Sequence, residues 1–427
     1  MTRRAVITGM GVVAPSGIGA DEHWKTVLDG DSKIGRISIF DPGPYDTSLA
    51  GEVRDFHAAD HVESRLAAQT DRWTWFGLAA AAEALGDAGI DPASTDPYRR
   101  AVVLASSSGG NHFGQQELQR LWSQPSRTVS AYQSIAWFYA ASVGQIAIRH
   151  QFKGPSCVLA AESAGGLDSI AHAARIISRG ASFVLAGGTE APLSPYALVC
   201  QQRSGWLSTS DDPERAYLPF GTGAAGYVPG EGGAVFVVED LDHALERKGA
   251  TIHAEVAGWG ATHDGEYSWR RGAGSVRQYA RAMRLALDRA GLRPSDIDVV
   301  IPDALAVPAY DVTEASALRQ VFGPDVPVTT QKPLVGRLYQ GGSALELATA
   351  LLAMRHQTIP AAAGVEQPAE GCELAFVRTN RPGPVNAIMI NARGFDGFNS
   401  SLIIRKYVLA PGDDPRGDRR RDEGTGR

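Results

Sequence analysis

The sequence predicts an α/β protein built from two similar halves. Short apolar runs rich in β-branched residues recur along its 427 residues, and stretches with apolar residues at helical spacing separate most of them. This alternation is typical of layered α/β proteins. Each half also opens with a strand that leads into glycine-rich sequence, VITGMGVVAPSG at 6–17 and AEVAGWGATHDG at 254–265. A duplicated α/β unit explains this pattern better than three unrelated domains.

The strands are predicted from the apolar runs and the helices from the helical spacing, in chain order. A charged segment, LDHALERKG at 241–249, ends in a glycine before a new strand, so we place the boundary between the halves there. The domains are then 1–250 and 251–409, and the Gly-, Pro- and charge-rich stretch 410–427 should be a disordered tail. The predicted strands are 5–7 (AVI), 101–105 (AVVLA), 157–160 (CVLA), 183–186 (FVLA), 234–238 (AVFVV), 252–258 (IHAEVAG), 299–301 (VVI) and 387–390 (AIMI); the predicted helices are 73–85, 165–179, 279–290, 312–322 and 343–356.

Composition excludes several classes of protein. With 44% hydrophobic and 21% charged residues the chain has an ordinary globular composition, and its net charge of −6 argues against nucleic acid or an anionic membrane as a partner. Three scattered cysteines, Cys157, Cys200 and Cys372, are too few for a disulfide framework or a zinc site, so we expect no metal, no cofactor and a reducing cytoplasm. The start shows no signal peptide, and no segment is apolar enough to span a membrane.

Residues 154–168, GPSCVLAAESAGGLD, resemble a nucleophile elbow. The apolar run 157–161 predicts a strand buried on both faces, and Gly165 and Gly166 let the following helix start close to it. Ser163 stands at the corner, over the free N–H groups of the helix, where a thiol would have a lowered pKa. A serine hydroxyl gains far less there without an adjacent base. The sequence therefore keeps the strand, turn and helix of an acyl-transfer site but not its nucleophile.

These motifs resemble the β-ketoacyl synthases of the thiolase fold over nearly the whole chain, from Arg4 to Arg405. Within that superfamily the chain is most similar to the chain length factor, the ketosynthase-like subunit of type II polyketide synthases. The resemblance implies a thiolase-like fold, a duplicated five-layer α-β-α-β-α sandwich. It rests on VITGMGVVAPSG, SAYQSIAWFYAASVGQIAIRH, AAESAGGLDS, RAYLPFGTGAAGYVPGEGGA and GFDGFN.

The resemblance also implies a degenerate active site. Condensing members use a cysteine and two histidines; these positions fall on Ser163, Asp303 and Arg337, while the lysine of the second histidine motif is kept as Lys332. Aspartate and arginine do not shuttle protons as imidazoles do, so we expect the two to form a salt bridge and no residue to be catalytic. Lys332 is expected to pair with Glu346 or Asp303. Chain length factors usually carry glutamine at the elbow, so Ser163 departs from that pattern too.

The resemblance also implies a second site, whose side chains limit the space for the growing acyl chain in a tunnel. The family's tunnel gate falls on Asn111, Gly114 and Leu118, whose spacing puts them on one face of a helix, and Tyr196 is expected to extend the wall. Two of the three are smaller than the bulky aromatics of a short tunnel, which predicts a long one. The alternative is that Asn111 faces solvent or a backbone carbonyl.

The implied partners are an active ketosynthase subunit, in a heterodimer, and an acyl carrier protein that carries malonyl units. The predicted interface contains four aromatic residues, Tyr132, Trp137, Phe138 and Tyr139. This chain should itself lack condensing activity. Two alternatives remain open: an autonomous malonyl-carrier decarboxylase or acyltransferase that uses Ser163, and an active homodimeric condensing enzyme with an altered triad.

Overall fold

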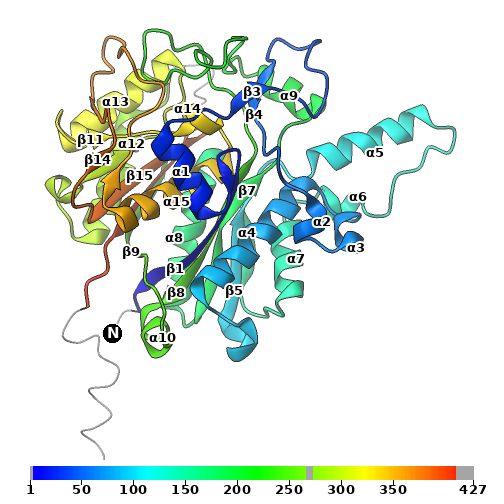
Figure 1. The fold of residues 1–427 in the computed structure, drawn as a ribbon, viewed down its shortest axis with the longest axis horizontal. Helices are drawn as coiled ribbons and strands as arrows, with labels where there is room; N and C mark the ends of the chain where they lie inside the picture. The colour runs from blue at the N-terminus through cyan, green and yellow to red at the C-terminus, as the bar shows by residue number, and fades with distance from the viewer. Residues whose placement is uncertain (1–2, 266–272, 410–427) are drawn as a thin grey trace, which may run out of the picture.

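The computed structural model describes residues 3–265 and 273–409, and its centre is one mixed sheet in which both halves take part (Figure 1). The first half contributes β6, β5, β7, β8 and β1, in that spatial order, and the second contributes β9, β16, β15, β10, β11 and β13. The halves join where Val6 and Ile7 of β1 pair with β9. The strands are β1 Ala5–Ala14, β5 Arg100–Ala105, β6 Ser156–Leu159, β7 Phe183–Glu190, β8 Gly232–Asp240, β9 Ala254–His263, β10 Val299–Ile301, β11 Pro327–Val328, β13 Ala375–Phe376, β15 Ala387–Gly394 and β16 Phe398–Arg405.

Strand pairing shows the duplication directly. From the junction outward, β1, β8 and β7 pair antiparallel, and β7, β5 and β6 then pair parallel. In the second half β9, β16 and β15 pair antiparallel, and β15, β10 and β11 parallel. The same order of connections therefore occurs twice.

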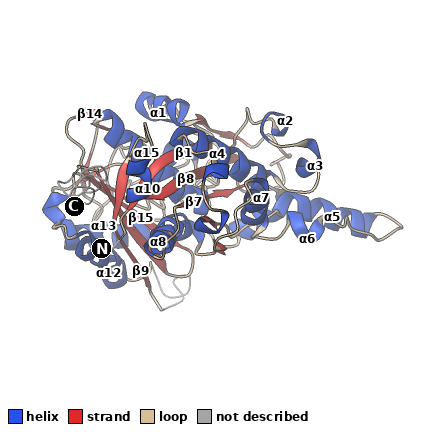
Figure 2. Ribbon diagram, turned by 90° about the horizontal axis from the view of Figure 1, so that it is seen from below, coloured by secondary structure: helices blue, strands red, loops and turns tan. Residues whose placement is uncertain are grey.

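The helices complete five layers (Figure 2). Two helices, α8 (Gly165–Ser178) and α15 (Gln340–His356), lie between the two parts of the sheet that the halves contribute, and they share one core with both parts. On the outer face of the first half lie α4 (Arg72–Ala88) and α7 (Ala141–Arg149). On that of the second lie α12 (Val276–Ala290) and α13 (Pro308–Phe322). The α-β-α-β-α sandwich predicted from the sequence is confirmed.

Side chains of the sheet alternate between these cores, as the pleat of a strand requires. In β8, Phe236 and Val238 face the central helices, whereas Val235 and Val237 face α4. The other helices and strands are β2 Gly17–Ile18, α1 Ala20–Asp29, β3 Ile34–Arg36, β4 Leu49–Gly51, α2 Ala58–His61, α3 Ser64–Ala67, α5 Asn111–Ser123, α6 Gln133–Ala136, α9 Pro195–Gln202, α10 Leu241–Glu246, α14 Lys332–Val335, β12 Thr358–Ile359 and β14 Arg381–Pro382.

The paired glycines that open each half let a helix approach a strand. A Cβ atom on Gly9 or Gly11 of β1 would lie 2.2 or 2.0 Å from a backbone oxygen of α4. In the second half, a Cβ atom on Gly258 or Gly260 of β9 would lie 2.1 Å from a backbone oxygen of α12. The glycines are needed because the outer helix of each half lies directly on the strand.

Every predicted strand and helix overlaps an observed one, but one expectation about burial was wrong. The run 157–161 was predicted to be a strand buried on both faces, yet β6 is an edge strand that pairs only with β5 in the described part of the chain. Ser156 is exposed and the rest of β6 is partly exposed. Its apolar composition reflects a surface that this chain alone does not cover.

The predicted domain boundary falls between α10 and β9, and the predicted tail, 410–427, lies outside the described residues. Cys157, Cys200 and Cys372 are free thiols. In the ranges 3–265 and 273–409, none of the helices is both long enough and apolar enough to cross a membrane.

Candidate functional site

The elbow lies where β6 leads into α8. A 3-10 turn, Glu162–Ala164, connects them, and Glu162 adopts a left-handed backbone with φ of 46°. A Cβ atom on Gly165 would lie 1.8 Å from the side chain of Gln340 in α15, and one on Gly166 would lie 2.5 Å from the Gln340 backbone oxygen. The two glycines therefore allow the two central helices to touch beside the elbow.

Ser163 is fully buried beneath α15. Its hydroxyl donates to the backbone oxygen of Tyr339 at 3.2 Å, and its own backbone oxygen accepts a hydrogen bond from Ser343 at 2.5 Å. Among the described residues, no carboxylate or imidazole hydrogen-bonds to the Ser163 hydroxyl. Without such a base the hydroxyl stays protonated, and in this environment it joins two elements of the core.

Asp303 and Arg337, which the sequence analysis placed at the positions of the two histidines, form a buried ion pair. An Arg337 nitrogen lies 3.0 Å from an Asp303 oxygen, and the two side chains are 3% and 1% exposed. Arg337 also lies 3.3 Å from Glu162 and donates to the backbone oxygen of Arg393 at 2.8 Å. The guanidinium thus holds together three segments of the site.

Charge stabilises both members of this pair against the cost of burial. Burial lowers the pKa of Arg337, but the carboxylates of Asp303 and Glu162 outweigh it and hold that pKa well above its ordinary value. Burial raises the pKa of Asp303, but Arg337 and then Lys332 lower it more, so the net shift is downward. Both groups are therefore charged near neutral pH, and neither exchanges a proton in the range where an imidazole would.

Lys332 and Glu314 are two further buried polar residues of the site. Lys332 forms a buried ion pair with Glu346, one of its two predicted partners, and burial raises the pKa of Glu346 to about 7 although Lys332 opposes that rise. Glu314 accepts hydrogen bonds from the backbone N–H groups of Asp303 and Ala304, at 2.7 and 2.8 Å. These contacts fix the loop that carries Asp303.

A cavity of about 840 Å³ opens beside the ion pair. Glu162, Arg337 and Tyr339 line it, but Ser163 does not. The Tyr339 hydroxyl lies 3.2 Å from that of Tyr227 and also hydrogen-bonds to Gln201. With a backbone φ of 53°, Tyr339 lies in the wall that separates the serine from the cavity.

Two of the four predicted gate residues line this cavity. Asn111, at the start of α5, and Tyr196, on α9, are both in its wall. Gly114 is buried, and a Cβ atom there would lie 3.0 Å from the indole of Trp137, so its small size accommodates the tryptophan. Leu118 is 48% exposed and is not in the wall. Gly114 and Leu118 are therefore not gathered with the other two within this chain.

Sequence reasoning missed several aromatic residues of the wall. Trp137 and Tyr139, which were predicted only for an interface, line the cavity together with Trp206 and Phe395. The GFDGFN motif contains Phe395 and could have indicated its position, whereas nothing in the sequence around Trp206 marks it.

The predicted interface residues lie on an arm, residues 111–139, which consists of α5, the segment between α5 and α6, α6 and the three residues after it, and which projects from the body (Figures 1 and 2). Tyr132, Trp137 and Phe138 are exposed, Tyr139 is half-buried, and Trp122 on the same arm is 75% exposed. Such a concentration of exposed aromatic surface is unusual for an isolated subunit.

Comparison with known protein families identifies two domains in the chain. Residues 2–244 match the N-terminal domain of the β-ketoacyl synthases and residues 253–366 match the C-terminal domain. The chain therefore belongs to the β-ketoacyl synthase family.

Within that family the similarity is to the beta subunits, or chain length factors, of type II polyketide synthases, which confirms the resemblance found in the sequence. The chain is 49% identical, over 94% of its length and 98% of the relative's, to the tetracenomycin polyketide synthase ketoacyl synthase beta subunit of Streptomyces glaucescens. It is 46% identical, over 95% of its length and 99% of the relative's, to the actinorhodin polyketide putative beta-ketoacyl synthase 2 of Streptomyces coelicolor. The solved ishigamide ketosynthase/chain length factor superposes with a TM-score of 0.89 at 27% identity, over 96% of this chain and all of that one.

Proposed function

We propose that this chain is the non-condensing subunit of a type II polyketide synthase, that it pairs with an active ketosynthase, and that it sets the length of the polyketide. The observation that carries the proposal is the ion pair of Asp303 and Arg337, extended to Glu162. It occupies the positions of both catalytic imidazoles with groups that stay charged, next to a buried hydroxyl that replaces the thiol. Such a site stabilises the fold and does not catalyse condensation, because no group in it is suited to decarboxylate malonyl or to hold an acyl chain.

Two surfaces support an obligate partner. The open edge of β6 offers unpaired backbone groups to another strand, and the arm adds the exposed rings of Trp137 and Phe138. Obligate interfaces typically bury more than about 2,000 Å² and are rich in apolar surface. We infer that the ketosynthase covers both surfaces, and that an acyl carrier protein delivers malonyl units to the cysteine of that partner.

The cavity supports the role in chain length. Asn111 and Trp137 line it and also belong to the arm that would contact the partner. A polyketide that grows from the partner's cysteine would enter between the two subunits and end against these side chains. The small polar side chain of Asn111 leaves room for a long chain.

Native mass spectrometry of the chain coexpressed with a ketosynthase tests the pairing. We expect a one-to-one heterodimer and little soluble chain in the absence of the partner. The double variant Trp137→Ser/Phe138→Ser should reduce the heterodimer, whereas Leu285→Ser, which changes an exposed apolar residue of α12, should not. A well-behaved homodimer that ignores the ketosynthase and condenses malonyl units would overturn the proposal.

Product analysis of the reconstituted synthase tests the length function. Asn111→Phe should shift the products to shorter chains, because the ring fills the cavity at that point. The matched control is His112→Phe, the same substitution at the next position, where the side chain is exposed and outside the cavity wall. Equal product lengths for both variants would place the limit elsewhere.

A further inference from the structure

The arm is held at its base by a small number of contacts. It begins with Asn111, the first residue of α5, which lines the cavity beside the ion pair. In the described structure, two side-chain hydrogen bonds join α5 to the body. The Phe113 N–H donates to Asp71 at 2.7 Å, and the Gln115 side-chain oxygen accepts from the Tyr196 N–H at 2.8 Å. Both contacts lie within four positions of Asn111.

Asp71 caps α5 from another part of the chain. The first N–H groups of a helix have no partner within the helix. The cap position of α5 is occupied by Gly110, which has no side chain that could accept a hydrogen bond from these groups. The Asp71 carboxylate accepts from the N–H of Phe113, the third residue of α5, and places negative charge at the positive end of that helix. Asp71 is only 3% exposed, so water does not compete for this contact.

The duplicated halves show that this use of Asp71 is specific to the arm. Asp71 directly precedes α4, where an aspartate normally accepts from an N–H group of its own helix, but its side chain makes no capping hydrogen bond to α4. The comparable outer helix of the second half, α12, is preceded by Ser275, whose side chain accepts from the Gln278 N–H at 3.2 Å. The second half therefore caps its own helix, whereas the first half uses the same position to hold α5.

Asp71 is itself fixed to the body. The next residue, Arg72, forms an ion pair with Glu231 at 2.8 Å, and the Glu231 side chain is 1% exposed. A Cβ atom on Gly110 would lie 3.1 Å from the Asp71 Cβ and 2.0 Å from the backbone oxygen of Ala136. The start of α5 and the end of α6 therefore meet at Asp71, which couples the position of α4 to that of the arm.

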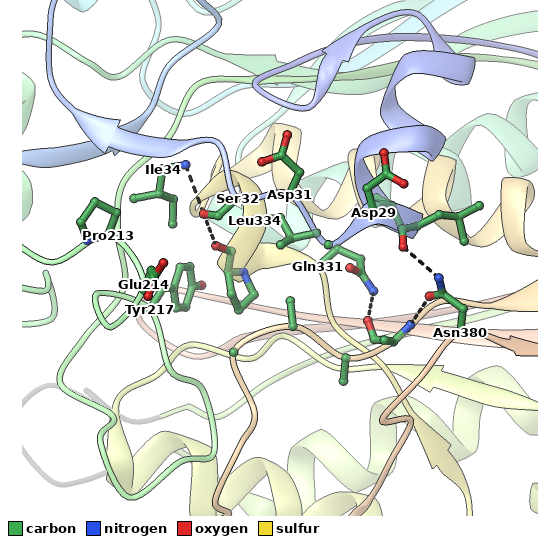
Figure 3. A pocket seen from close by; sticks show the side chains of 18 of the residues that line it. Asp29, Asp31, Ser32, Ile34, Pro213, Glu214, Tyr217, Gln331, Leu334 and Asn380 are labelled. Atoms are coloured by element: carbon green, nitrogen blue, oxygen red, sulfur yellow. Dashed lines mark hydrogen bonds between the residues drawn. The ribbon is translucent and has the colours of Figure 1, made fainter.

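A second large cavity lies apart from the arm. Its volume is about 920 Å³, and it lies at the C-terminal end of α1, where Figure 3 shows Asp29 and Gln331 in its wall. Among the described residues that line it, none belongs to the arm. A shift of α5 would therefore change the cavity that contains Asn111 and not this one.

From these contacts we infer that Asp71 and Gln115 are positioning residues for the limit on chain length. They act through Asn111, because the two hydrogen bonds fix where α5 leaves the body and so the depth at which Asn111 closes the cavity. The inference rests on the proposed function, in which this cavity receives the growing polyketide. When the cap is lost, the first turn of α5 is free to withdraw, and the cavity accepts longer chains.

Product analysis of the reconstituted synthase tests the inference. The sample is this chain in complex with its coexpressed ketosynthase, supplied with a malonyl-loaded acyl carrier protein. In Asp71→Ala we expect the ratio of longer to native-length products to rise about fivefold, the factor that corresponds to the loss of one helix cap. The rate of malonyl consumption should stay close to that of the native complex, because condensation takes place in the partner.

The conservative variant separates the hydrogen bond from a general effect of substitution. Asp71→Asn keeps an oxygen that can accept from the Phe113 N–H, so it should restore the native product length. Native product lengths in a folded Asp71→Ala complex would overturn the inference. It would also be overturned if Asp71→Asn lengthened the products as much as Asp71→Ala.

Ser275→Ala is the matched control, because it removes the cap of α12 and leaves the arm untouched. It should lower stability without changing product length, and hydrogen exchange should be faster at the start of α12 only. In Asp71→Ala the faster exchange should appear at 111–115 instead. Equal lengthening of the products in both variants would show that product length follows general stability, which would refute the role of Asp71.

Gln115→Ala tests the second contact at a half-buried position, where substitution disturbs the core less. It too should lengthen the products. If Asp71→Ala does not fold, this variant decides the matter, and native product lengths in it then overturn the inference. Asn111→Phe distinguishes the two levels of the argument. If it shortens the products while the Asp71 and Gln115 variants keep the native length, this inference fails and the proposed function stands; if it also has no effect, the proposed limit at Asn111 fails.

Discussion

Replacing Arg337 with methionine should lower the free energy of unfolding by about 3 to 5 kcal/mol, because it leaves a buried carboxylate without its partner. The Asp303 side chain is 1% exposed and lies 3.0 Å from Arg337, so water does not take over the lost contact. The hydrogen bond from Arg337 to the backbone oxygen of Arg393 is lost as well. Urea unfolding followed by tryptophan fluorescence, near pH 7, measures the change.

A double variant separates the cost of an unpaired charge from the value of the pair. Asp303→Leu/Arg337→Met replaces both charges with apolar groups, and such replacements are often neutral or stabilising. We therefore expect the double variant to unfold at a higher urea concentration than Arg337→Met alone. A double variant that loses the sum of the two single effects would refute the reasoning, because it would show no coupling between the residues.

The pH dependence gives a second check on the same reasoning. In the native protein the pKa of Asp303 is held below its ordinary value, so the stability it contributes is present above the unfolded pKa of about 3.9 and is lost as the pH falls through the folded pKa. In Arg337→Met, burial dominates and the pKa of this carboxyl rises instead. The difference in unfolding free energy between the native protein and Arg337→Met should therefore shrink when the pH is lowered from 7 to 5. A difference that does not change would contradict this account.

The remaining predictions concern other parts of the molecule. Ser163→Cys should resist alkylation by iodoacetamide in the folded protein while the exposed Cys200 reacts, as peptide mapping would show; rapid labelling at position 163 would mean that the wall at Tyr339 opens. Gly11→Ala should destabilise by about 1 to 3 kcal/mol or more because its Cβ would lie 2.0 Å from a backbone oxygen. Gly86→Ala in α4, which meets nothing within 4 Å, should stabilise by up to about 1 kcal/mol, and urea midpoints compare the two. Burial raises the pKa of Glu190 to about 7, so its folded pKa exceeds the unfolded one; stability should fall as the pH rises from 5 to 8, and Glu190→Gln should flatten that decline.

The layers of the fold could be predicted from the sequence because local pattern determines them. Apolar runs and helical spacing located the elements of both halves, and the repeated glycine pairs indicated the duplication. The exposure of β6 could not be predicted in this way. A strand covered by its own helices and a strand left partly exposed at the edge of the sheet can have the same apolar composition, as the run 157–161 shows.

The candidate site was predictable in its chemistry and less so in its shape. The residue types of Asp303 and Arg337 suggested an ion pair, which the structure contains. The wall of the cavity depends on contacts between distant segments, such as Trp206 and Phe395, whose rings lie 5.2 Å apart. Helical spacing placed Gly114 with Asn111, but only the three-dimensional structure shows that the glycine accommodates Trp137.

The place of β1 in the sheet has a consequence for how the chain is made. This strand precedes the other described strands along the chain, yet its neighbours on both sides, β8 and β9, come more than 200 residues later. The contact between Thr8 and Glu239, for example, spans 231 positions. At synthesis rates of 5 to 20 residues per second, β1 waits roughly 10 to 50 seconds for its neighbours. Through that interval the backbone groups of β1 that pair with β8 and β9 lack these partners, so the first half completes its native sheet only after β8 has been synthesised.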